Sequence, residues 1–271
     1  VIVMDDAIEY FKANNIQYGE FHFAPSKFVQ LGFDFHEMMA VLYEKIEEAE
    51  EKHGIRMRFL IDVSRTFGAE NALRNVNYAL SANNKYIIGI GLGGNEATGP
   101  AEDYQGPFTV ARENGLKIVA HSGEAVGPYS IWQTIKYLGA MRIGHGTSAM
   151  FDNKLMDELK ERFIPLEICP TSNIYTAAYV KRLEDHPIRF FYDKGVPLSI
   201  SSDDPTFFNC TLSDEYFNVY KYIDFNLLEL EEIVYNSIDQ SFYPDKKGLK
   251  KSYKKQIAEV KKNYPDLFPV D

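Results

Sequence analysis

The sequence predicts an α/β protein built as a TIM-type (β/α)8 barrel, and three observations support this fold class. Short apolar runs alternate with amphipathic stretches along the whole chain. The apolar runs are continuous rather than alternating, as in parallel strands that are covered on both faces. The chain has 271 residues, and such barrels need about 250. We therefore expect one barrel domain over residues 1–271.

Seven apolar runs are predicted to be the strands. Each is short and lies next to Gly, Pro or polar residues that favour turns. They cover residues 18–23, 57–63, 86–91, 117–121, 141–145, 164–169 and 196–201. Seven strands are one fewer than the barrel needs, and residues 5–14 are predicted as a helix before the first strand. Because the chain also begins at Val1 rather than Met, we interpret it as a barrel whose first βα unit is missing.

The amphipathic stretches between the strands are predicted to be helices, which makes the connections right-handed crossovers and the sheet parallel. They cover residues 37–53, 69–83, 105–113, 130–138, 153–162 and 186–194. Glycines 54, 115, 139 and 195 follow four of them, where a helix often ends. Residues 212–222, 227–237 and 249–262 are predicted as further helices, packed at the carboxyl end of the barrel.

Composition excludes several classes of partner. The chain has 39 acidic and 29 basic residues and a net charge of -10, which argues against binding to a nucleic-acid backbone. No apolar run is long enough to cross a membrane, so we expect no membrane partner. The two cysteines do not form a disulfide framework, and this is consistent with a reducing compartment. We expect a cytoplasmic protein.

Polar side chains stand at the ends of three predicted strands. One strand ends in His121, with Glu124 three residues later, another ends in His145, and a third leads to Asp203 and Asp204. Because the carboxyl ends of parallel strands meet at one edge of the sheet, these groups are expected to form one site.

The residue types at this edge indicate a metal centre with acid–base chemistry. Two adjacent carboxylates raise each other's pKa unless a cation compensates them, and His with Asp suits zinc. Glu124 suits a general acid or base, and the alternative is a helix first-turn glutamate stabilised by the helix dipole. His145 could be a third ligand, an orienting group, a proton shuttle or a structural histidine.

Two loops offer weaker signals. The segment from Gly91 to Glu96 is glycine-rich and lets the backbone approach a planar ligand, but it lacks the motifs that bind nucleotide phosphates. The segment from Cys169 to Asn173 is interpreted first as structural support of the site. Contact of Ser172 or Asn173 with a substrate is the second interpretation, and Cys169 is expected to be a buried thiol.

In combination and order, these motifs resemble the adenosine deaminase family of metal-dependent (β/α)8 barrels. The matching segments are Tyr18-Gly19-Glu20-Phe21-His22-Phe23-Ala24-Pro25, Gly91 to Glu96, His121-Ser122-Gly123-Glu124-Ala125, Arg142-Ile143-Gly144-His145-Gly146, Cys169-Pro170-Thr171-Ser172-Asn173 and Ser201-Ser202-Asp203-Asp204-Pro205. They span nearly the whole chain. The resemblance implies hydrolytic deamination of an aminopurine, most simply adenosine, with one zinc ion per chain.

The resemblance also implies a role for each matched residue. His121 and Asp203 would be zinc ligands, and Asp203 would also belong to the catalytic group. Glu124 would give a proton to the purine ring nitrogen, and His145 would orient the attacking oxygen. Asp204 would bind the ring, with a backbone contact from Gly94.

The sequence departs from the family pattern at one important point. The family's first strand carries a His-x-His pair that supplies two more zinc ligands, and no such pair exists among the six histidines here. His22 lies in a segment that resembles the second strand and is not expected to replace it. Four readings stay open: an adenosine, adenine, methylated adenine nucleotide or aminodeoxyfutalosine deaminase. A catalytically inactive barrel that acts as a binding protein is a fifth, and a metal-dependent hydrolase of esters or amides fits less well.

Overall fold

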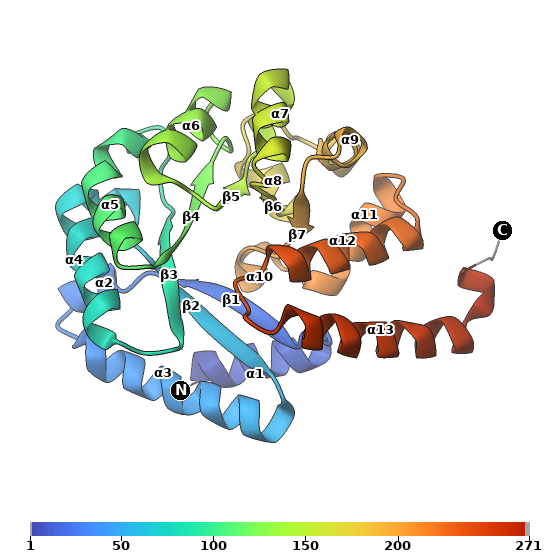
Figure 1. The fold of residues 1–271 in the computed structure, drawn as a ribbon, viewed down its shortest axis with the longest axis horizontal. Helices are drawn as coiled ribbons and strands as arrows, with labels where there is room; N and C mark the ends of the chain where they lie inside the picture. Colours follow the sequence, from blue (N-terminus) through green and yellow to red (C-terminus); the bar gives the residue numbers. More distant parts are fainter. Residues whose placement is uncertain (1, 269–271) are drawn as a thin grey trace.

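A computed structural model describes residues 2–268, and its centre is one curled sheet of seven parallel strands (Figure 1). The strands are β1 (Tyr18–Phe23), β2 (Arg56–Asp62), β3 (Ile87–Leu92), β4 (Lys117–Ser122), β5 (Arg142–His145), β6 (Leu166–Ile168) and β7 (Leu198–Ile200). They pair in chain order, so β1 and β7 are the two edges. The fold prediction is confirmed, with every strand found. Within residues 2–268 no eighth strand joins β7 to β1.

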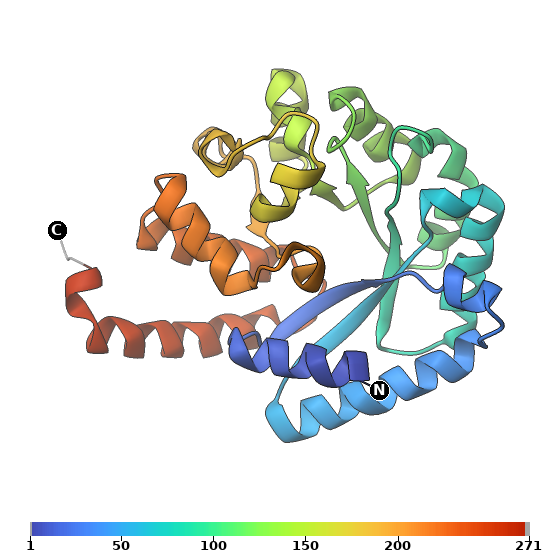
Figure 2. The ribbon, with the colours of Figure 1, turned by 180° about the vertical axis from the view of Figure 1, so that it is seen from behind.

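Helices cover the outer side of the curled sheet (Figures 1 and 2). They are α1 (Ile2–Ala13), α2 (Ser26–Gln30), α3 (Phe35–His53), α4 (Gly68–Ala82), α5 (Gln105–Glu113), α6 (Pro128–Gln133), α7 (Asn153–Glu161) and α9 (Ile188–Lys194). Helix α8 (Pro170–Thr176) instead lies at the carboxyl end of β6, where its Ser172 contacts Asp203. The helix ends predicted from glycine are confirmed at Gly54 and Gly195. Both residues have left-handed backbone conformations and end α3 and α9. The stretch 130–138, expected as one helix, continues from α6 into a π-helical turn over Thr134–Leu138. Helix α8 was not expected.

The core lies between the sheet and the helices. Fully buried side chains from the helices, such as Met39, Val76, Phe108 and Phe191, meet the apolar side chains of the strands. The helices thereby cover the outer face of the sheet, and its inner face lines the space that the curl encloses, which is consistent with the continuous apolar runs in the sequence.

The C-terminal helices α11 (Leu212–Tyr222), α12 (Leu227–Gln240) and α13 (Lys246–Asn263) follow the short α10 (Pro205–Phe208). Helix α11 lies at the carboxyl end, where the Glu215 carboxylate accepts a hydrogen bond from Thr171 N at 3.1 Å. The segment after α12 instead crosses the amino end: Phe242 N donates to Glu20 Oε1 at 2.7 Å. The expectation that all three helices pack at the carboxyl end is therefore wrong for α12 and α13, because their partners lie at the strand starts. Gln240, at the end of α12, donates to the carbonyl oxygen of Leu198 at 3.0 Å, and Gln256 of α13 accepts from Asn15, just before β1.

Among residues 2–268, none of the helices combines the length and the apolar character that a membrane span requires.

Candidate active site

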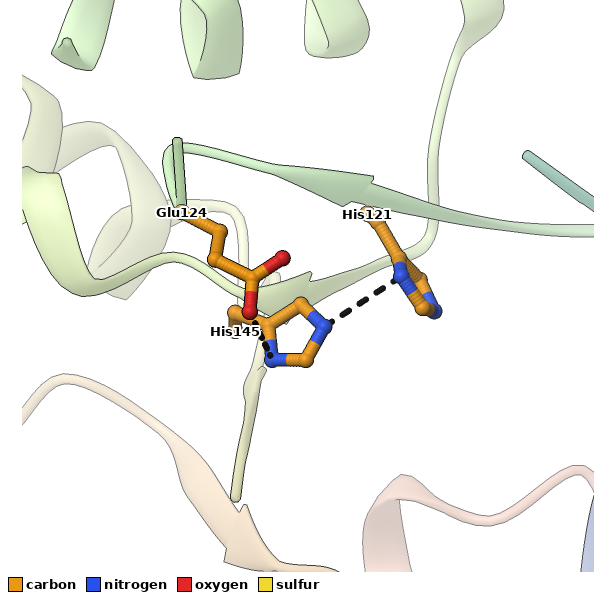
Figure 3. Close-up of side chains that lie close together, drawn as sticks. All are labelled: His121, Glu124 and His145. Carbon is orange, nitrogen blue, oxygen red and sulfur yellow. Dashed lines mark hydrogen bonds and ion pairs between the residues drawn. The ribbon is translucent and has the colours of Figure 1, made fainter. Parts of the chain in front are cut away.

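Strands β4 and β5 bring His121 and His145 together at the carboxyl end of the sheet. In the register, His121 lies beside Gly144 and Ser122 beside His145. Nε2 of His145 is 3.2 Å from Nδ1 of His121 (Figure 3). A Cβ at Gly144 would stand 2.7 Å from Cδ2 of His121, so the glycine makes room for the imidazole.

Glu124 reaches the same point from the loop after β4. Its Oε1 is 3.5 Å from Nδ1 of His145 (Figure 3), and it accepts a hydrogen bond from Thr176 Oγ1. Burial raises the pKa of Glu124, and the bond from Thr176 opposes this shift. A carboxyl group whose pKa is raised keeps its proton closer to neutral pH, as a general acid must.

Glu96 holds the loop that carries Glu124, a role the sequence did not reveal. Its Oε1 accepts from Gly123 N, and its Oε2 accepts from the amides of Glu124, Ala125 and Val126 at 3.1, 2.8 and 3.3 Å. The side chain is buried, and Ser130 Oγ also donates to it. One carboxylate therefore satisfies four consecutive backbone donors and fixes the turn after His121.

Two of the predicted site residues have left-handed backbone conformations. The φ angles are +64° at His145 and +55° at Asp203, a region in which residues other than Gly are uncommon. Each turns the chain sharply at the end of its strand. Asp203 is also held by Ser172 Oγ, which donates to its Oδ2 at 2.6 Å. Such conformations cluster at functional sites.

A cavity of about 1640 Å³ occupies the inside of the curled sheet and the gap between β1 and β7. Every predicted site residue except Glu124 lines it: His121, His145, Gly94, Asp203 and Asp204. Desolvation, together with the Asp203 charge, raises the pKa of Asp204. Gly94 has a φ of +84°, and a side chain there would meet Ser64 and the backbone of Arg65. The cavity therefore joins the predicted metal ligands and binding residues with His145.

His22 enters the same cavity, next to the predicted metal site. Its ring centre is 5.4 Å from that of His121, and its Nδ1 is 3.7 Å from Asp62 Oδ2. Burial would lower the pKa of His22, but the Asp62 carboxylate outweighs burial and raises it. A Cβ at Gly91 would stand 2.3 Å from Nδ1 of His22, so the ring occupies space that this glycine leaves.

The described residues form two groups with metal-ligand spacing, and both include His145. In one, ligand atoms of His121, Glu124 and His145 lie within 4.8 Å of one another; the other consists of His145, Cys169 and Asp203. The two predicted ligands, His121 and Asp203, thus fall in different groups joined by His145. Burial lowers the pKa of His121 to about 4, so its imidazole is neutral at pH 7 and able to bind a metal. Neutral imidazole with carboxylate is a donor set that fits zinc.

The fold and the site together define an α/β barrel protein with a polar site at the carboxyl ends of its strands. A model of the adenosine deaminase family matches residues 2–260, and the chain belongs to this family. It is 35% identical over 229 residues to the aminodeoxyfutalosine deaminase of Streptomyces avermitilis, covering 84% of this chain and 64% of the relative. It is 33% identical over 237 residues to the adenosine deaminase of Clostridium acetobutylicum, covering 88% and 70%. The chain thus spans about two thirds of the length of these relatives.

Solved structures agree on the fold. The adenine deaminase of Arthrobacter aurescens superposes with a TM-score of 0.88 at 25% identity, covering 93% of this chain and 77% of that one. A zinc-bound amidohydrolase from Burkholderia ambifaria gives a TM-score of 0.91 at 21% identity, covering 97% and 74%.

Proposed function

We propose that the protein catalyses the hydrolytic deamination of an aminopurine, with adenosine as the first substrate to test and zinc as the metal. The observation that carries the proposal is the group of His121, Glu124 and His145, whose ligand atoms lie within 4.8 Å of one another at the carboxyl end of the sheet. The relatives named above, an aminodeoxyfutalosine deaminase and an adenosine deaminase, support a substrate with an amino-substituted purine ring.

His121 and Asp203 would hold the metal. When bound, zinc supplies the Lewis acidity that makes a water molecule nucleophilic near neutral pH. In the reaction, water and the aminopurine give the oxo-purine and ammonia. The raised pKa of Glu124 suits this side chain to hold a proton and give it to the ring nitrogen beside the reacting carbon.

Other residues would position the substrate. Asp204 lines the cavity with a carboxyl group whose pKa is raised, so it can present a proton or an acceptor to a second ring nitrogen. The backbone at Gly94, which has no side chain, lets a flat ring approach. His145 would orient the attacking oxygen.

The experiment compares the 271-residue chain with a form that includes any residues preceding Val1 in the natural protein. Zinc content is measured for both, and ammonia release and loss of ultraviolet absorbance are followed with adenosine, adenine and aminodeoxyfutalosine. Release of ammonia from one of the three, dependent on zinc, is the expected result. Stoichiometric zinc without ammonia from any aminopurine would overturn the proposal. Purine binding without zinc or turnover would instead favour a binding protein.

A further inference from the structure

A line of buried polar side chains runs from His145 away from the cavity and ends at a backbone amide. Ile188 N donates to Nδ1 of His186 at 3.1 Å. A backbone N–H can only donate, so Nδ1 of His186 is an acceptor. Burial lowers the pKa of His186 to about 3, so the ring is neutral at pH 7. Its single ring proton is therefore on Nε2.

That proton sets the orientation of Asn173. Nε2 of His186 is 3.2 Å from Oδ1 of Asn173, which must accept. The other end of the amide, Nδ2, is then the donor, and it lies 3.1 Å from Nδ1 of His145. Asn173 is fully buried, so water does not offer it other partners. The lone pair on Nδ1 of His145 is thereby used as an acceptor.

We infer that Asn173 and His186 are positioning residues that fix His145 as the tautomer with its proton on Nε2. This nitrogen faces His121, whose Nδ1 lies 3.2 Å away. A neutral ring that carries its proton there can donate toward the site but cannot remove a proton through the same nitrogen. Under the proposed function, on which this consequence rests, His145 orients the attacking oxygen and is not the base.

The hydrogen bonds of Asn173 and His186 oppose the effect of Glu124 on the His145 tautomer. Glu124 Oε1 lies 3.5 Å from Nδ1 of His145, and in its ionised form it would accept a hydrogen bond from that nitrogen in the other tautomer. The donor end of Asn173 opposes this carboxylate and keeps Nδ1 unprotonated. His186 in turn prevents the amide from rotating by half a turn. Each of the two residues is therefore needed for the tautomer, although neither faces the cavity.

The test is the ¹⁵N spectrum of the histidine rings in the metal-free 271-residue chain at pH 8. In the wild type we expect Nδ1 of His145 to resonate as an unprotonated nitrogen and Nε2 as a protonated one. Asn173→Asp puts an acceptor beside Nδ1 and should exchange the two signals. His186→Leu should give a mixture, and His186→Gln, whose amide can still donate to Asn173, should restore the wild-type pattern.

Asn71→Asp is the matched control, because Asn71 is a buried asparagine that bonds to Ser26. It should leave the His145 signals unchanged. A protonated Nδ1 in the wild type, or an unchanged tautomer in folded Asn173→Asp, would overturn the inference. The spectrum requires no turnover. It therefore tests the tautomer independently of the ammonia assay, which tests the deaminase proposal. In a form that is active, Asn173→Asp should lower kcat by about 10²-fold with little change in KM.

Discussion

The two ends of the curled sheet both carry charged groups, but these groups are compensated differently. At the amino end, the Arg142 guanidinium pairs with Glu20 and with Glu167, and the ring of Phe242 lies 3.9 Å from it. At the carboxyl end, no arginine or lysine within residues 2–268 pairs with Glu124 or Asp204, and desolvation raises the pKa of both. Charges that neutralise one another stabilise the amino end. Groups that lack such partners leave the carboxyl end ready to bind a ligand.

The amino end is also held by contacts with the C-terminal segment. The segment after α12 fits over the strand starts, and Arg142 Nη1 donates to the carbonyl oxygen of Gln240 at 3.1 Å. The carboxyl end instead contains the left-handed residues His145 and Asp203. The cavity extends between the two ends, because Glu20 and Arg142 line it as well. This division predicts that substitutions at the carboxyl end reduce activity, whereas those at the amino end reduce stability.

The largest effect is expected from Glu124→Gln, measured as kcat for the aminopurine that the assay identifies. Loss of the proton donor should lower turnover by about 10²- to 10⁴-fold, with zinc content unchanged. Glu161→Gln, at an exposed position of α7, is the control and should behave as wild type. Equal losses of zinc and turnover would reject the proton-donor role.

Arg142→Met should be the most destabilising substitution at the amino end. It leaves the carboxylates of Glu20 and Glu167 buried without their partner, which costs about 3–5 kcal/mol of unfolding free energy. Urea unfolding measures the loss. Arg162→Met breaks the exposed pair with Glu158 and should cost under about 1 kcal/mol. Similar losses for the two variants would contradict the contrast between a buried network and a surface pair.

Gly144→Ala tests the close packing beside His121. The added methyl group would stand 2.7 Å from Cδ2 of His121, so the imidazole must move, at a cost of about 1–3 kcal/mol. Zinc titration should show weaker binding in the same variant. Gly106→Ala in α5 meets nothing within 4 Å and should stabilise the helix by up to about 1 kcal/mol. Unchanged zinc affinity in Gly144→Ala would remove His121 from the ligand set.

The smallest effect concerns pH and His186. Burial lowers the pKa of His186 to about 3, against about 6.5 in the unfolded chain. Above pH 6.5 both states hold a neutral ring, so the residue contributes no pH dependence. Below pH 6.5 the unfolded state binds a proton that the folded state does not, and stability falls until about pH 3.

Between pH 7.5 and 5.5 this amounts to about 1.4 kcal/mol. His186→Gln should lose that much less unfolding free energy than wild type over this interval, by urea unfolding at the two pH values. His53→Gln, at an exposed position, is the control. Parallel losses in wild type and His186→Gln would show that His186 is protonated equally in both states.

The strands were predictable because parallel strands covered on both faces are continuous apolar runs, bounded here by turn residues. Helix α8 was not predictable, since Pro170-Thr171-Ser172-Asn173 has the composition of a loop. The π-helical turn after α6 was not predictable either, because it changes the backbone hydrogen bonds but hardly changes the spacing of apolar residues in the sequence. The crossing of Phe242 over the amino end depends on contacts between residues far apart in the chain.

At the site, the residues that stand at strand ends were predictable and those that hold them were not. His121, His145 and Asp203 each follow an apolar run, so topology alone brings them to one edge. Glu96 holds amides at least 27 positions away, and His186 acts on Asn173, 13 positions away in the chain. A single sequence carries no signal for such pairs.

The hydrogen bonds of Glu96 have a consequence for how this barrel can be rebuilt. Glu96 belongs to the loop after β3, but the amides that it holds belong to the loop after β4. Barrel loops are often treated as independent parts that can be exchanged one at a time. Here the acid-bearing loop would lose its support if it were grafted alone, so the smallest transferable unit is the pair of loops together.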